Sequence, residues 1–300
     1  MSEYHNPVLL KESVDALVRR ADGRYADATF GGGGHSREIL SRLSGKGSLI
    51  AFDRDADAAS NVPDDRRFTL IHNNFRFIHN YVMRDCPDGL DGILADLGVS
   101  SHQFDTADRG FSFRFNAPLD MRMNVQGSKT AVDIVNSYTQ EELEKILKIY
   151  GEVENARRMA SLIVSSRTKE PIRTTGDLDN AIAAALPSNA EHKVLAKVYQ
   201  ALRIEVNDEM RSLEKFLEGA AKSLRRGGIL AVITYHSLED RMVKNFIRYG
   251  NTAGNDVRDI YGNGSAVLKA VNHKPVLPGE EEIFRNTRAR SAKLRVAQKI

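Results

Sequence analysis

The chain has 300 residues, of which 41% are hydrophobic and 28% are charged, and this is enough apolar material to bury one large core or two smaller ones. Lys and Arg number 43 against 40 Asp and Glu, so the net charge of +3 does not by itself indicate a nucleic-acid partner. The single cysteine, Cys86, excludes an intramolecular disulfide and a zinc site made of several cysteines, and we expect no bound metal.

The sequence carries no recognisable targeting or membrane signal. The segment Met1–His5 has no basic region followed by an apolar run, and no stretch approaches the ~18 consecutive apolar residues of a membrane span. We therefore expect a cytoplasmic protein without a membrane partner.

Short apolar runs alternate with helix-like patterns in the first third of the chain, which indicates a parallel α/β sheet. The expected strands are 23–29, 48–52, 68–71 and 92–97, and the expected helices are 11–18, 36–43, 55–61 and 77–83. The β pattern returns only at 228–234, a run typical of a fully buried strand, and at 292–297. The sheet is therefore interrupted by a long segment of another kind.

That segment has a helical period from about residue 137 to residue 224. Leu143, Ile146, Leu147 and Tyr150 follow the spacing of one helix face, and Thr139-x-x-Glu142 predicts a capping box at its start. The simplest architecture is a helical block inserted after the fourth strand, with domain parts at 1–128, 129–206 and 207–300. The stretches 100–128 and 250–264 lack periodicity and are expected to be long loops.

Four consecutive glycines, Gly31–Gly34, followed by His35, lie between the first expected strand and the next helix. Backbone N–H groups at a helix N-terminus, with no Cβ to hinder close approach, suit a nucleotide-like cofactor. The dinucleotide fingerprint fails, because Ser36 or Arg37 stands where its third glycine is required. The P-loop pattern fails as well, so phosphates are not the evident target. The alternative is a tight turn without a ligand.

Two carboxylates end strands near this turn. Asp53 ends the second strand, where it can accept hydrogen bonds from both ribose hydroxyls of an adenosine moiety, and S-adenosylmethionine has a ribose but no phosphate. Asp96 ends the fourth strand, beside the position at which open α/β sheets bind ligands. Each has an ordinary alternative: Asp53 as a surface carboxylate and Asp96 as a cap of the next turn.

At this point the chain resembles one known family, the ribosomal RNA small-subunit methyltransferase H proteins, also called MraW. The resemblance extends from one end of the chain to the other, and its middle motifs are long and unusual. The matching segments are His5–Leu10, Asp27–Ser36, Phe52–Asp55, Asp91–Ser101, Arg109–Phe113, Pro118–Met123, Gln200–Asn207, His236–Arg241 and Arg288–Arg295.

The resemblance implies a fold and an activity. The fold would be a Rossmann-like class I S-adenosylmethionine methyltransferase sheet with an inserted all-helical domain. The activity would be transfer of a methyl group from S-adenosylmethionine to the exocyclic N4 of one cytidine in the decoding region of 16S rRNA. The implied partner is 16S rRNA or the 30S subunit, and a homodimer is left open.

The same motifs imply which residues bind the cofactor. Phe75 would lie against the adenine, although from the residue alone it fits a core position equally well. The sequence departs from the family pattern at Lys193–Lys197, at Thr287, and at Thr234-Tyr235, where Ser-Phe is more typical. The implied cofactor-binding residues are Gly33, Gly34, His35, Asp53, Phe75, Asp96 and Gln103.

The chemistry of the target base indicates what the catalytic groups must do. A cytosine amino group is a poor nucleophile because its lone pair is delocalised into the ring, so the enzyme must orient the amine and accept its hydrogen bonds. We expect Asp96 and the carbonyls of the Leu97–Ser101 loop to do this, with Asp120 and His236 as second candidates. His236 has an alternative interpretation as a helix-entry residue whose neighbours Ser237 and Asp240 form the cap.

Two related chemistries are disfavoured. Methylation at carbon 5 of cytosine requires a cysteine nucleophile, and Cys86 lies in a turn before the fourth strand. Amino-methyltransferases of DNA typically carry Asp or Ser, two prolines and an aromatic residue here, whereas this chain has Asp96–Val99. We therefore expect no DNA partner.

Basic residues gather in two places where RNA could bind. One is the C-terminal run, which has no acidic residue after Glu282, and the other is the long loop, where arginines alternate with phenylalanines. A solvated basic face is the ordinary explanation, and contacts with RNA phosphates and bases are the one we favour. The residues are Arg285, Arg288, Arg290, Lys293, Arg295 and Lys299 in the run, and Arg109, Arg114, Arg122, Phe111, Phe113 and Phe115 in the loop.

Two functions from other classes fit these residues less well. A non-catalytic ribosome-assembly factor could keep the fold as an RNA-binding scaffold, but it would not need the glycine loop with Asp53 and Asp96. A nicotinamide-dependent dehydrogenase is disfavoured by the missing third glycine.

Overall fold

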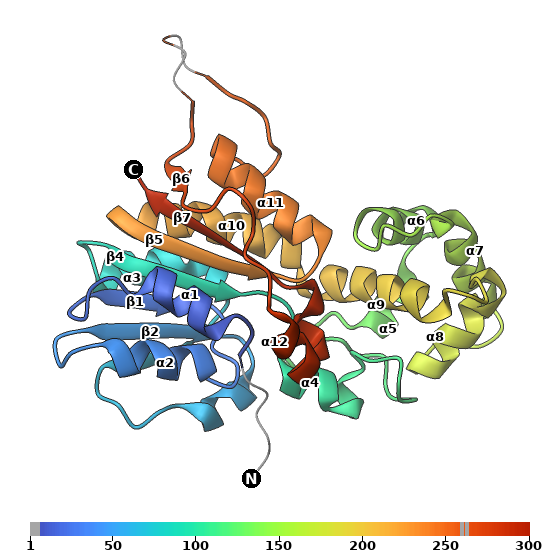
Figure 1. Ribbon diagram of the computed structural model, residues 1–300. Coiled ribbons are helices and arrows are strands. Elements are labelled where there is room, and N and C mark those ends of the chain that lie inside the picture. The colour runs from blue at the N-terminus through green and yellow to red at the C-terminus, as the bar shows by residue number, and fades with distance from the viewer. Residues whose placement is uncertain (1–6, 259–260, 262–263) are drawn as a thin grey trace. The chain divides into compact units, whose positions relative to one another are not determined.

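The computed structural model describes residues 7–258, 261 and 264–300 (Figure 1). His5 and Asn6 of the first family-like segment lie outside this range, as does part of the expected loop 250–264. The chain divides into two compact units, a sheet unit of residues 1–98 and 210–300 and a helical unit of residues 99–209. Each unit is described by itself below.

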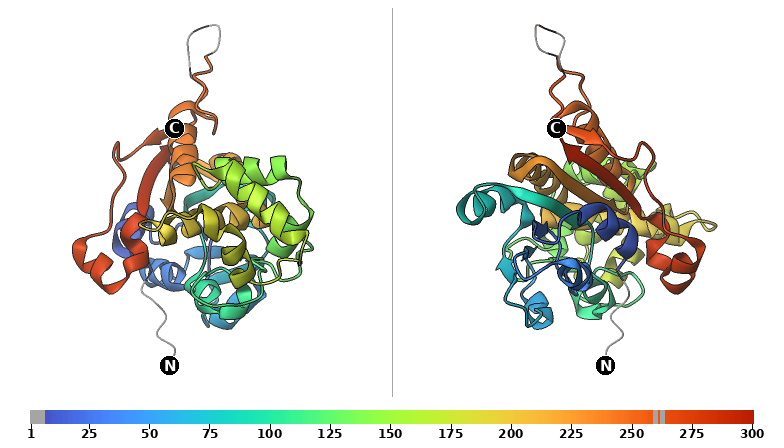
Figure 2. Two further views of the ribbon diagram at one scale, coloured as in Figure 1. Left: turned by 90° about the vertical axis from the view of Figure 1, so that its right-hand side faces the viewer. Right: turned by 60° about the vertical axis from the view of Figure 1, so that its left-hand side comes forward.

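The sheet unit contains a seven-stranded sheet in the order β3-β2-β1-β4-β5-β7-β6. Strands β1 to β5 are parallel, whereas β7 is antiparallel to both of its neighbours, β5 and β6. Figure 2 shows β7 running alongside β5. The strands are β1 (Arg24–Asp27), β2 (Ser48–Asp53), β3 (Phe68–His72), β4 (Leu90–Asp96), β5 (Leu224–Thr234), β6 (Leu268–Ala270) and β7 (Lys293–Lys299).

Helices cover both faces of this sheet (Figure 1). One apolar core joins the sheet to α3, α10 and α11, and a second core joins the other face to α1, α2 and a short helix near the C-terminus. The helices of the unit are α1 (Leu10–Leu17), α2 (Gly34–Arg42), α3 (Ile78–Asp85), α10 (Glu209–Ser223), α11 (Ser237–Tyr249) and α12 (Glu280–Arg285), with 3-10 helices η1 (Ala56–Asn61), η2 (Phe75–Phe77) and η5 (Thr287–Ser291).

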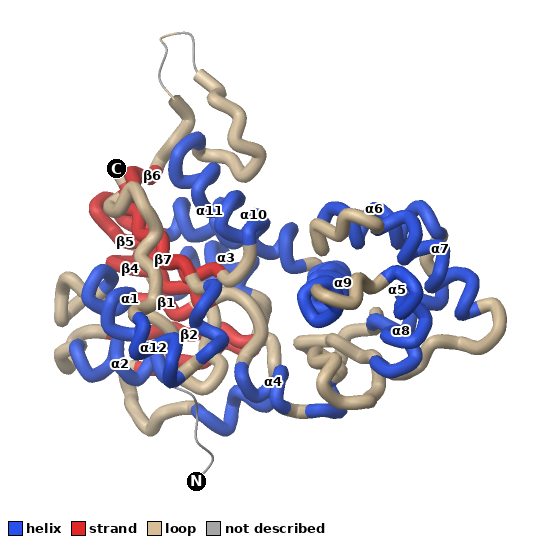
Figure 3. The backbone as a smooth tube through the Cα atoms, turned by 45° about the vertical axis from the view of Figure 1, so that its right-hand side comes forward, coloured by secondary structure: helices blue, strands red, loops and turns tan. Residues whose placement is uncertain are grey.

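The helical unit has its own apolar core, and the named strands of the described chain all lie outside it (Figure 3). Its core includes Phe111, Leu119, Met121 and Met123 from the segment that precedes α5. The elements are α4 (Ser101–Asp105), η3 (Ala107–Arg109), α5 (Ala131–Ser137), α6 (Gln140–Ile149), α7 (Ala156–Arg167), α8 (Thr175–Ile182), η4 (Ala183–Ala185) and α9 (Glu191–Asn207).

The expected elements are largely present, with differences that have local causes. All six expected strands form, and the Thr139–Glu142 capping box is confirmed at the start of α6. The helix expected at 55–61 is a 3-10 helix, and the expected loop 100–128 contains α4 and η3. The helical pattern across residue 208 is broken into α9 and α10, because Asp208 adopts a left-handed conformation with φ of 50°.

The boundaries of the compact units differ from those drawn on the sequence. The first falls between Gly98 and Val99 instead of after residue 128, and the second follows Glu209. The physical reason for the first difference is the burial of Phe111, Leu119 and Met121, which pack in the helical core although their sequence shows no regular period.

No described helix is long and apolar enough to cross a membrane.

Candidate active site

The candidate site lies at the edge of the sheet where the parallel strands end. Asp27, Asp53, His72 and Asp96 are the last residues of β1, β2, β3 and β4, and parallel strands place their carboxyl ends at one edge. The turn from Phe30 to Gly34 follows β1 at this edge and leads into α2. The fold therefore gathers acidic groups next to a helix N-terminus.

The glycines of this turn are required by the backbone itself. Gly33 is the N-cap of α2 and has φ of +76°, a left-handed conformation that favours glycine. A Cβ added to Gly34 would lie 2.1 Å from Cγ of Pro7, so only glycine fits there. Neighbouring side chains hold the turn: Asn61 donates to the Gly31 carbonyl at 3.0 Å, and Arg37 donates to the Gly32 carbonyl at 2.7 Å.

Asp53 is joined to the glycine turn by a direct hydrogen bond. Its Oδ2 accepts the N–H of Gly31 at 2.8 Å, and its Oδ1 accepts the N–H of Asp55 at 2.8 Å. Burial raises the pKa of Asp53 above the ordinary carboxyl value, although both N–H donors oppose this. Since a carboxylate oxygen has two lone pairs, each oxygen keeps acceptor capacity beyond its backbone donor.

Asp27, at the end of β1, has a structural role: it accepts hydrogen bonds from residues on both sides of the glycine turn that leads into α2. It is 1% exposed, its Oδ2 accepts the hydroxyl of Ser36 at 2.7 Å, and its Oδ1 accepts the N–H of Thr29 at 3.0 Å. These bonds fix the path of the chain on both sides of the glycine turn.

Asp96 is the carboxylate with the most unusual surroundings. Its Oδ1 accepts the phenolic O–H of Tyr235 at 2.7 Å, and its Oδ2 lies 3.8 Å from Nδ1 of His35. Burial raises the pKa of Asp96 to about 6, even though His35 and the Tyr235 hydrogen bond both favour the ionised form. The side chain nevertheless keeps 21% of its surface exposed. A carboxylate in this state can exchange a proton near neutral pH.

His35 is oriented by the N-terminal segment. Its Nε2 lies 3.1 Å from the carbonyl oxygen of Val8, and because a carbonyl only accepts, Nε2 must carry the hydrogen. The ring is 6% exposed. The structure therefore brings together three residues from distant parts of the sequence, His35, Asp96 and Tyr235, of which the sequence motifs had indicated the first two.

Phe75 is the first residue of η2, directly after β3. It is half-buried, and its ring packs edge-on against Phe216 with centroids 5.2 Å apart. One part of the ring thus belongs to the core between the sheet and α10, which was the alternative weighed for this residue.

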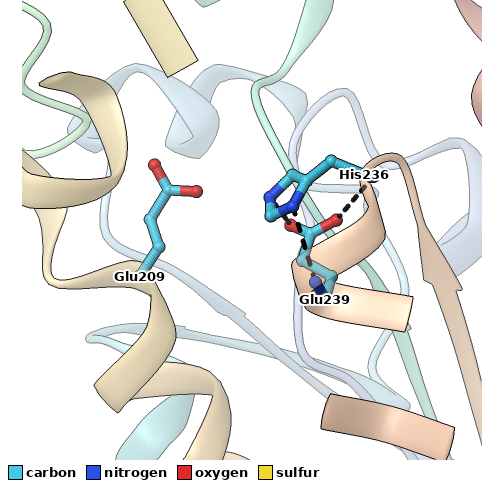
Figure 4. Close-up of side chains that lie close together, drawn as sticks. All are labelled: Glu209, His236 and Glu239. Carbon is cyan, nitrogen blue, oxygen red and sulfur yellow. Dashed lines mark hydrogen bonds and ion pairs between the residues drawn. The ribbon is translucent and has the colours of Figure 1, made fainter. Parts of the chain in front are cut away.

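His236 is the N-cap of α11, and the helix begins one residue after it (Figure 4). Its Nδ1 accepts the N–H of Glu239 at 3.5 Å, and its Nε2 lies 3.2 Å from Oε1 of Glu239. The cap expected from Ser237 and Asp240 is therefore wrong, since His236 and Glu239 form the capping box instead. Oε2 of Glu239 also accepts the N–H of Tyr235 at 2.9 Å, so the cap fixes the backbone beside Asp96.

Gln103 and Asp120 belong to the helical unit. Gln103 is 5% exposed, and its side-chain oxygen accepts the N–H of Ser100 at 3.2 Å. Asp120 forms a two-pronged pair with Arg122, from Nε to Oδ1 at 2.8 Å and from Nη2 to Oδ2 at 2.6 Å. Burial acts to raise the pKa of Asp120, but the hydrogen bonds from Arg122 outweigh it and lower the pKa below the ordinary value.

Several arginines expected to face RNA are engaged inside the protein. Arg295 pairs with Asp240 at 2.6 Å with 11% of its side chain exposed, and Arg109 donates to the carbonyls of Arg122 and Met123. Phe111 is buried in the core of the helical unit, and Phe113 packs against Tyr199. The surface-facing members of both groups are Arg285, Arg290, Arg114 and Phe115.

The donors and acceptors at the sheet edge fit S-adenosylmethionine. The ribose of this cofactor carries two hydroxyl donors and its methionine part carries an ammonium group, and both need acceptors. Asp53 and Asp96 offer carboxylate oxygens on either side of the glycine turn, and the half-buried Phe75 offers an aromatic ring just beyond β3. The guanidinium of Arg37, the basic group next to the turn, is occupied by carbonyls, as suits a ligand without phosphates.

Comparison with known proteins agrees with this chemistry. The model of the MraW methylase family matches residues 2–300. The chain is 53% identical to the ribosomal RNA small subunit methyltransferase H of Parabacteroides distasonis over 298 residues, covering 99% of this chain and 98% of the relative. It is 52% identical to the protein of the same name from Flavobacterium johnsoniae, also covering 99% and 98%.

The solved structures that match this chain are more distant in sequence. They include an rRNA methylase from Streptococcus thermophilus, with a TM-score of 0.42, 11% identity and coverage of 97% of this chain and 93% of that one. Another is TrmN from Thermus thermophilus, with a TM-score of 0.43, 12% identity and coverage of 97% and 48%. On the full-length family match and the identities above 50%, the chain belongs to the MraW methylase family of S-adenosylmethionine-dependent methyltransferases.

Proposed function

We propose that this enzyme transfers the methyl group of S-adenosylmethionine to the exocyclic N4 of one cytidine in the decoding region of 16S rRNA. The observation that carries the proposal is Asp96, a partly buried carboxylate at the end of β4 with its two oxygens turned to Tyr235 and His35. The relatives that share half of the sequence are named as methyltransferases of small-subunit ribosomal RNA.

Asp96 is suited to accept first a hydrogen bond and then a proton from the target amine. The exocyclic amine must be held so that its weakly available lone pair faces the sulfonium methyl, and an oxygen acceptor for its N–H achieves this orientation. An ionised Asp96 can accept the hydrogen bond and then the proton that the amine loses after methylation. Because its pKa lies at about 6, the carboxylate is ionised at neutral pH and is still basic enough to assist.

The cofactor supplies an electrophilic methyl group, and the chain supplies its binding site. We assign Asp53 to the ribose hydroxyls and Phe75 to the adenine. We assign Gly33, Gly34 and His35 to the wall of the site at the N-terminus of α2, where the missing Cβ of Gly34 leaves room for the ring of Pro7. Gln103, from α4, is assigned to the cofactor on the family resemblance.

Asp120 and His236, the second candidates for this acceptor role, are less suited to bind the target amine. Both oxygens of Asp120 are held by the Arg122 guanidinium, and both ring nitrogens of His236 face Glu239. They stay candidates for substrate orientation, and their variants are included in the experiment below.

Amine methylation is favoured over methylation at carbon 5. Cys86 follows α3 and precedes β4, whereas Asp96 is at the opposite end of that strand. Cys86 is 7% exposed, and burial raises the pKa of its thiol, so the thiolate required for attack on a base is disfavoured.

We propose 16S rRNA, either naked or in the 30S subunit, as the partner, and hence the cytoplasm as the site of action. Arg285 and Arg290 are exposed near the end of the sheet unit and are suited to phosphates, as is Arg114 of the helical unit. Binding through these groups should weaken steeply as salt rises. A homodimer is a separate prediction, tested by light scattering of the purified chain.

The experiment supplies labelled S-adenosylmethionine with 30S subunits, naked 16S rRNA and duplex DNA, and maps the modified nucleotide by mass spectrometry. We expect one N4-methylated cytidine in the RNA and no label in DNA. The variants Asp96→Asn, Asp120→Asn and His236→Gln are compared with Asp85→Asn, a matched change of an exposed aspartate that pairs with Arg84. Label only in DNA, or on carbon 5, would contradict the proposal.

The same experiment distinguishes a methyltransferase from a non-catalytic assembly factor. Such a scaffold would bind the 30S subunit without incorporating label, and its affinity would be unchanged in the Asp96→Asn variant.

A further inference from the structure

Tyr235 has a position that the function proposed above does not explain. It is the first residue after β5, and β5 lies beside β4, with Ile233 in register with Asp96. Its side chain therefore reaches across from one strand end to the next, where its hydroxyl meets Oδ1 of Asp96 at 2.7 Å. The contact joins residues 139 positions apart in the sequence.

The surroundings of Tyr235 hold it rigidly in this position. Its backbone N–H donates to Oε2 of Glu239 at 2.9 Å, so the capping box of α11 fixes the main chain. Its ring lies beside Gly98, where a Cβ would be 3.5 Å from Cδ2 of the ring and where φ is +101°. The hydroxyl is thus presented to Asp96 by a backbone and a ring that are both constrained.

The two oxygens of Asp96 are treated differently by their neighbours. Oδ1 receives the phenol at hydrogen-bonding distance, whereas Oδ2 lies 3.8 Å from His35 Nδ1, beyond that distance. A hydrogen bond on one oxygen fixes the rotation of the carboxylate and stabilises its charged form. The second oxygen then keeps its full acceptor capacity for a ligand, whereas the first has one lone pair engaged by the phenol.

We propose that in this chain, where Tyr235 replaces the Phe that is more typical of the family, the phenolic O–H positions Asp96 for methyl transfer: it fixes Oδ1 so that Oδ2 accepts the hydrogen bond of the target amine. This inference rests on the proposed function, since it assigns the use of the same site. Tyr235 does not touch the reacting atoms and acts only through Asp96.

The charge state of Asp96 depends on every group that faces it. His35 of α2 and Tyr235 favour the ionised form, whereas burial and the carboxylates of Asp27 from β1 and Glu239 from α11 favour the protonated one. Removing the phenol leaves the opposing influences in place, so the pKa of Asp96 rises. A larger fraction of the enzyme then carries a protonated Asp96, which cannot accept the amine proton.

The test is the variant Tyr235→Phe, which keeps the ring and deletes the donor. Loss of a hydrogen bond to a charged group corresponds to about one pKa unit, so the acid limb of the kcat profile should move up by roughly one pH unit. At pH 6.5 kcat should fall about threefold, at pH 5 about tenfold, and it should recover as the pH is raised, while KM for S-adenosylmethionine changes less than about threefold.

The matched control is Tyr25→Phe. Tyr25 is also a buried tyrosine of the sheet unit, and its hydroxyl donates to the Arg20 carbonyl at 2.9 Å, away from Asp96. This variant should lose stability without moving the pH profile. Because His35 also faces Asp96, with Nδ1 3.8 Å from Oδ2, the Tyr235→Phe profile is measured again in the His35→Gln background, where the shift should persist.

A second readout does not depend on RNA. With ¹³C-labelled aspartate, assigned through the Asp96→Asn variant, NMR titration should show the Asp96 pKa raised in Tyr235→Phe and unchanged in Tyr25→Phe. A pH-independent loss of kcat, or an unmoved titration, would overturn the role of Tyr235. Absence of transfer to RNA by the native enzyme would instead overturn the proposed function, whatever the titration shows.

Discussion

The end of β4 in the sheet unit and the 118–123 segment of the helical unit each present an aspartate, and the two are in opposite electrostatic situations. Asp96 is surrounded by a phenol, an imidazole and other carboxylates, and burial raises its pKa to about 6. Both oxygens of Asp120 accept hydrogen bonds from the Arg122 guanidinium, which lowers the pKa of Asp120 although burial acts to raise it. Both side chains retain a similar exposure, 21% and 25%.

The difference shows that partners, more than exposure, decide what a carboxylate can do. An oxygen held by a guanidinium is a weak base and a fixed structural anchor. A carboxylate held by neutral donors in a partly buried site keeps its basicity and can accept a proton. Both aspartates occur in motifs shared with the family, so the sequence pattern alone does not separate their roles.

The largest expected effect is that of Asp96→Asn on kcat. The amide cannot accept the amine proton, so we expect kcat to fall by about 10²–10³-fold, the usual range for losing an acid–base or electrostatic group. The measurement is single-turnover methyl transfer to 30S subunits and naked rRNA. Activity within a few-fold of that of Asp85→Asn would show that Asp96 is not the acceptor.

The pH dependence of the native enzyme separates the two aspartates directly. Since the acceptor must be ionised, and burial raises the pKa of Asp96 to about 6, kcat should fall about tenfold per pH unit below that value and level off above it. If Asp120 were the acceptor, its lowered pKa would leave kcat flat down to about pH 4. A profile without a limb between about pH 5 and 7 would therefore contradict the assignment of Asp96.

Asp120→Asn should affect stability more than chemistry. It breaks a two-pronged pair whose side chains are about a quarter exposed, so we expect a loss of about 1 kcal/mol and a fall of about 2–4 °C in the melting temperature. The fall in kcat should stay below about tenfold. A folded variant with an unchanged melting temperature but no activity would reverse the comparison.

The arginines also divide into those paired inside the protein and those that face solvent. Substituting one of the solvent-facing arginines should have the smallest effect of those predicted. Arg290→Ala should weaken RNA binding a few-fold and reduce the slope of log K against log salt by about one unit, because one phosphate contact is lost. Arg295→Ala should instead lower the melting temperature, since Arg295 pairs with Asp240 at 2.6 Å. Titrations at several salt concentrations and thermal melts of both variants measure this difference.

The sheet and its order of elements could be predicted because their signals are local. The buried run at 228–234 forms the C-terminal part of β5, and Thr139 caps α6 as its spacing with Glu142 predicted. Helix breaks with weak local signals were not predicted. Asp208 ends α9 in a left-handed conformation that aspartate adopts only occasionally, and nothing in the periodicity announces it.

The site was predicted less completely, for a physical reason. Strand-end residues such as Asp53 and Asp96 can be placed from the strand pattern, but their partners depend on contacts across the fold. The Tyr235 hydroxyl reaches Asp96 only because β5 lies beside β4, and histidine is not among the residues that usually cap helices, so the His236 cap was assigned to its neighbours. Ion pairs such as Arg295 with Asp240 were likewise invisible in a basic run.

The raised pKa of Asp96 also has a consequence for the stability of the protein. A carboxyl whose pKa is higher in the folded state contributes stability that is present below its unfolded value, 3.8, and is lost as the pH rises through about 6. At pH 8 the charged Asp96 therefore weakens the fold by roughly 2–3 kcal/mol, and Asp96→Asn should melt at a higher temperature than the native enzyme. Selection for thermal tolerance alone would remove this carboxylate, so under the proposed role of Asp96 catalysis and stability oppose each other at this position.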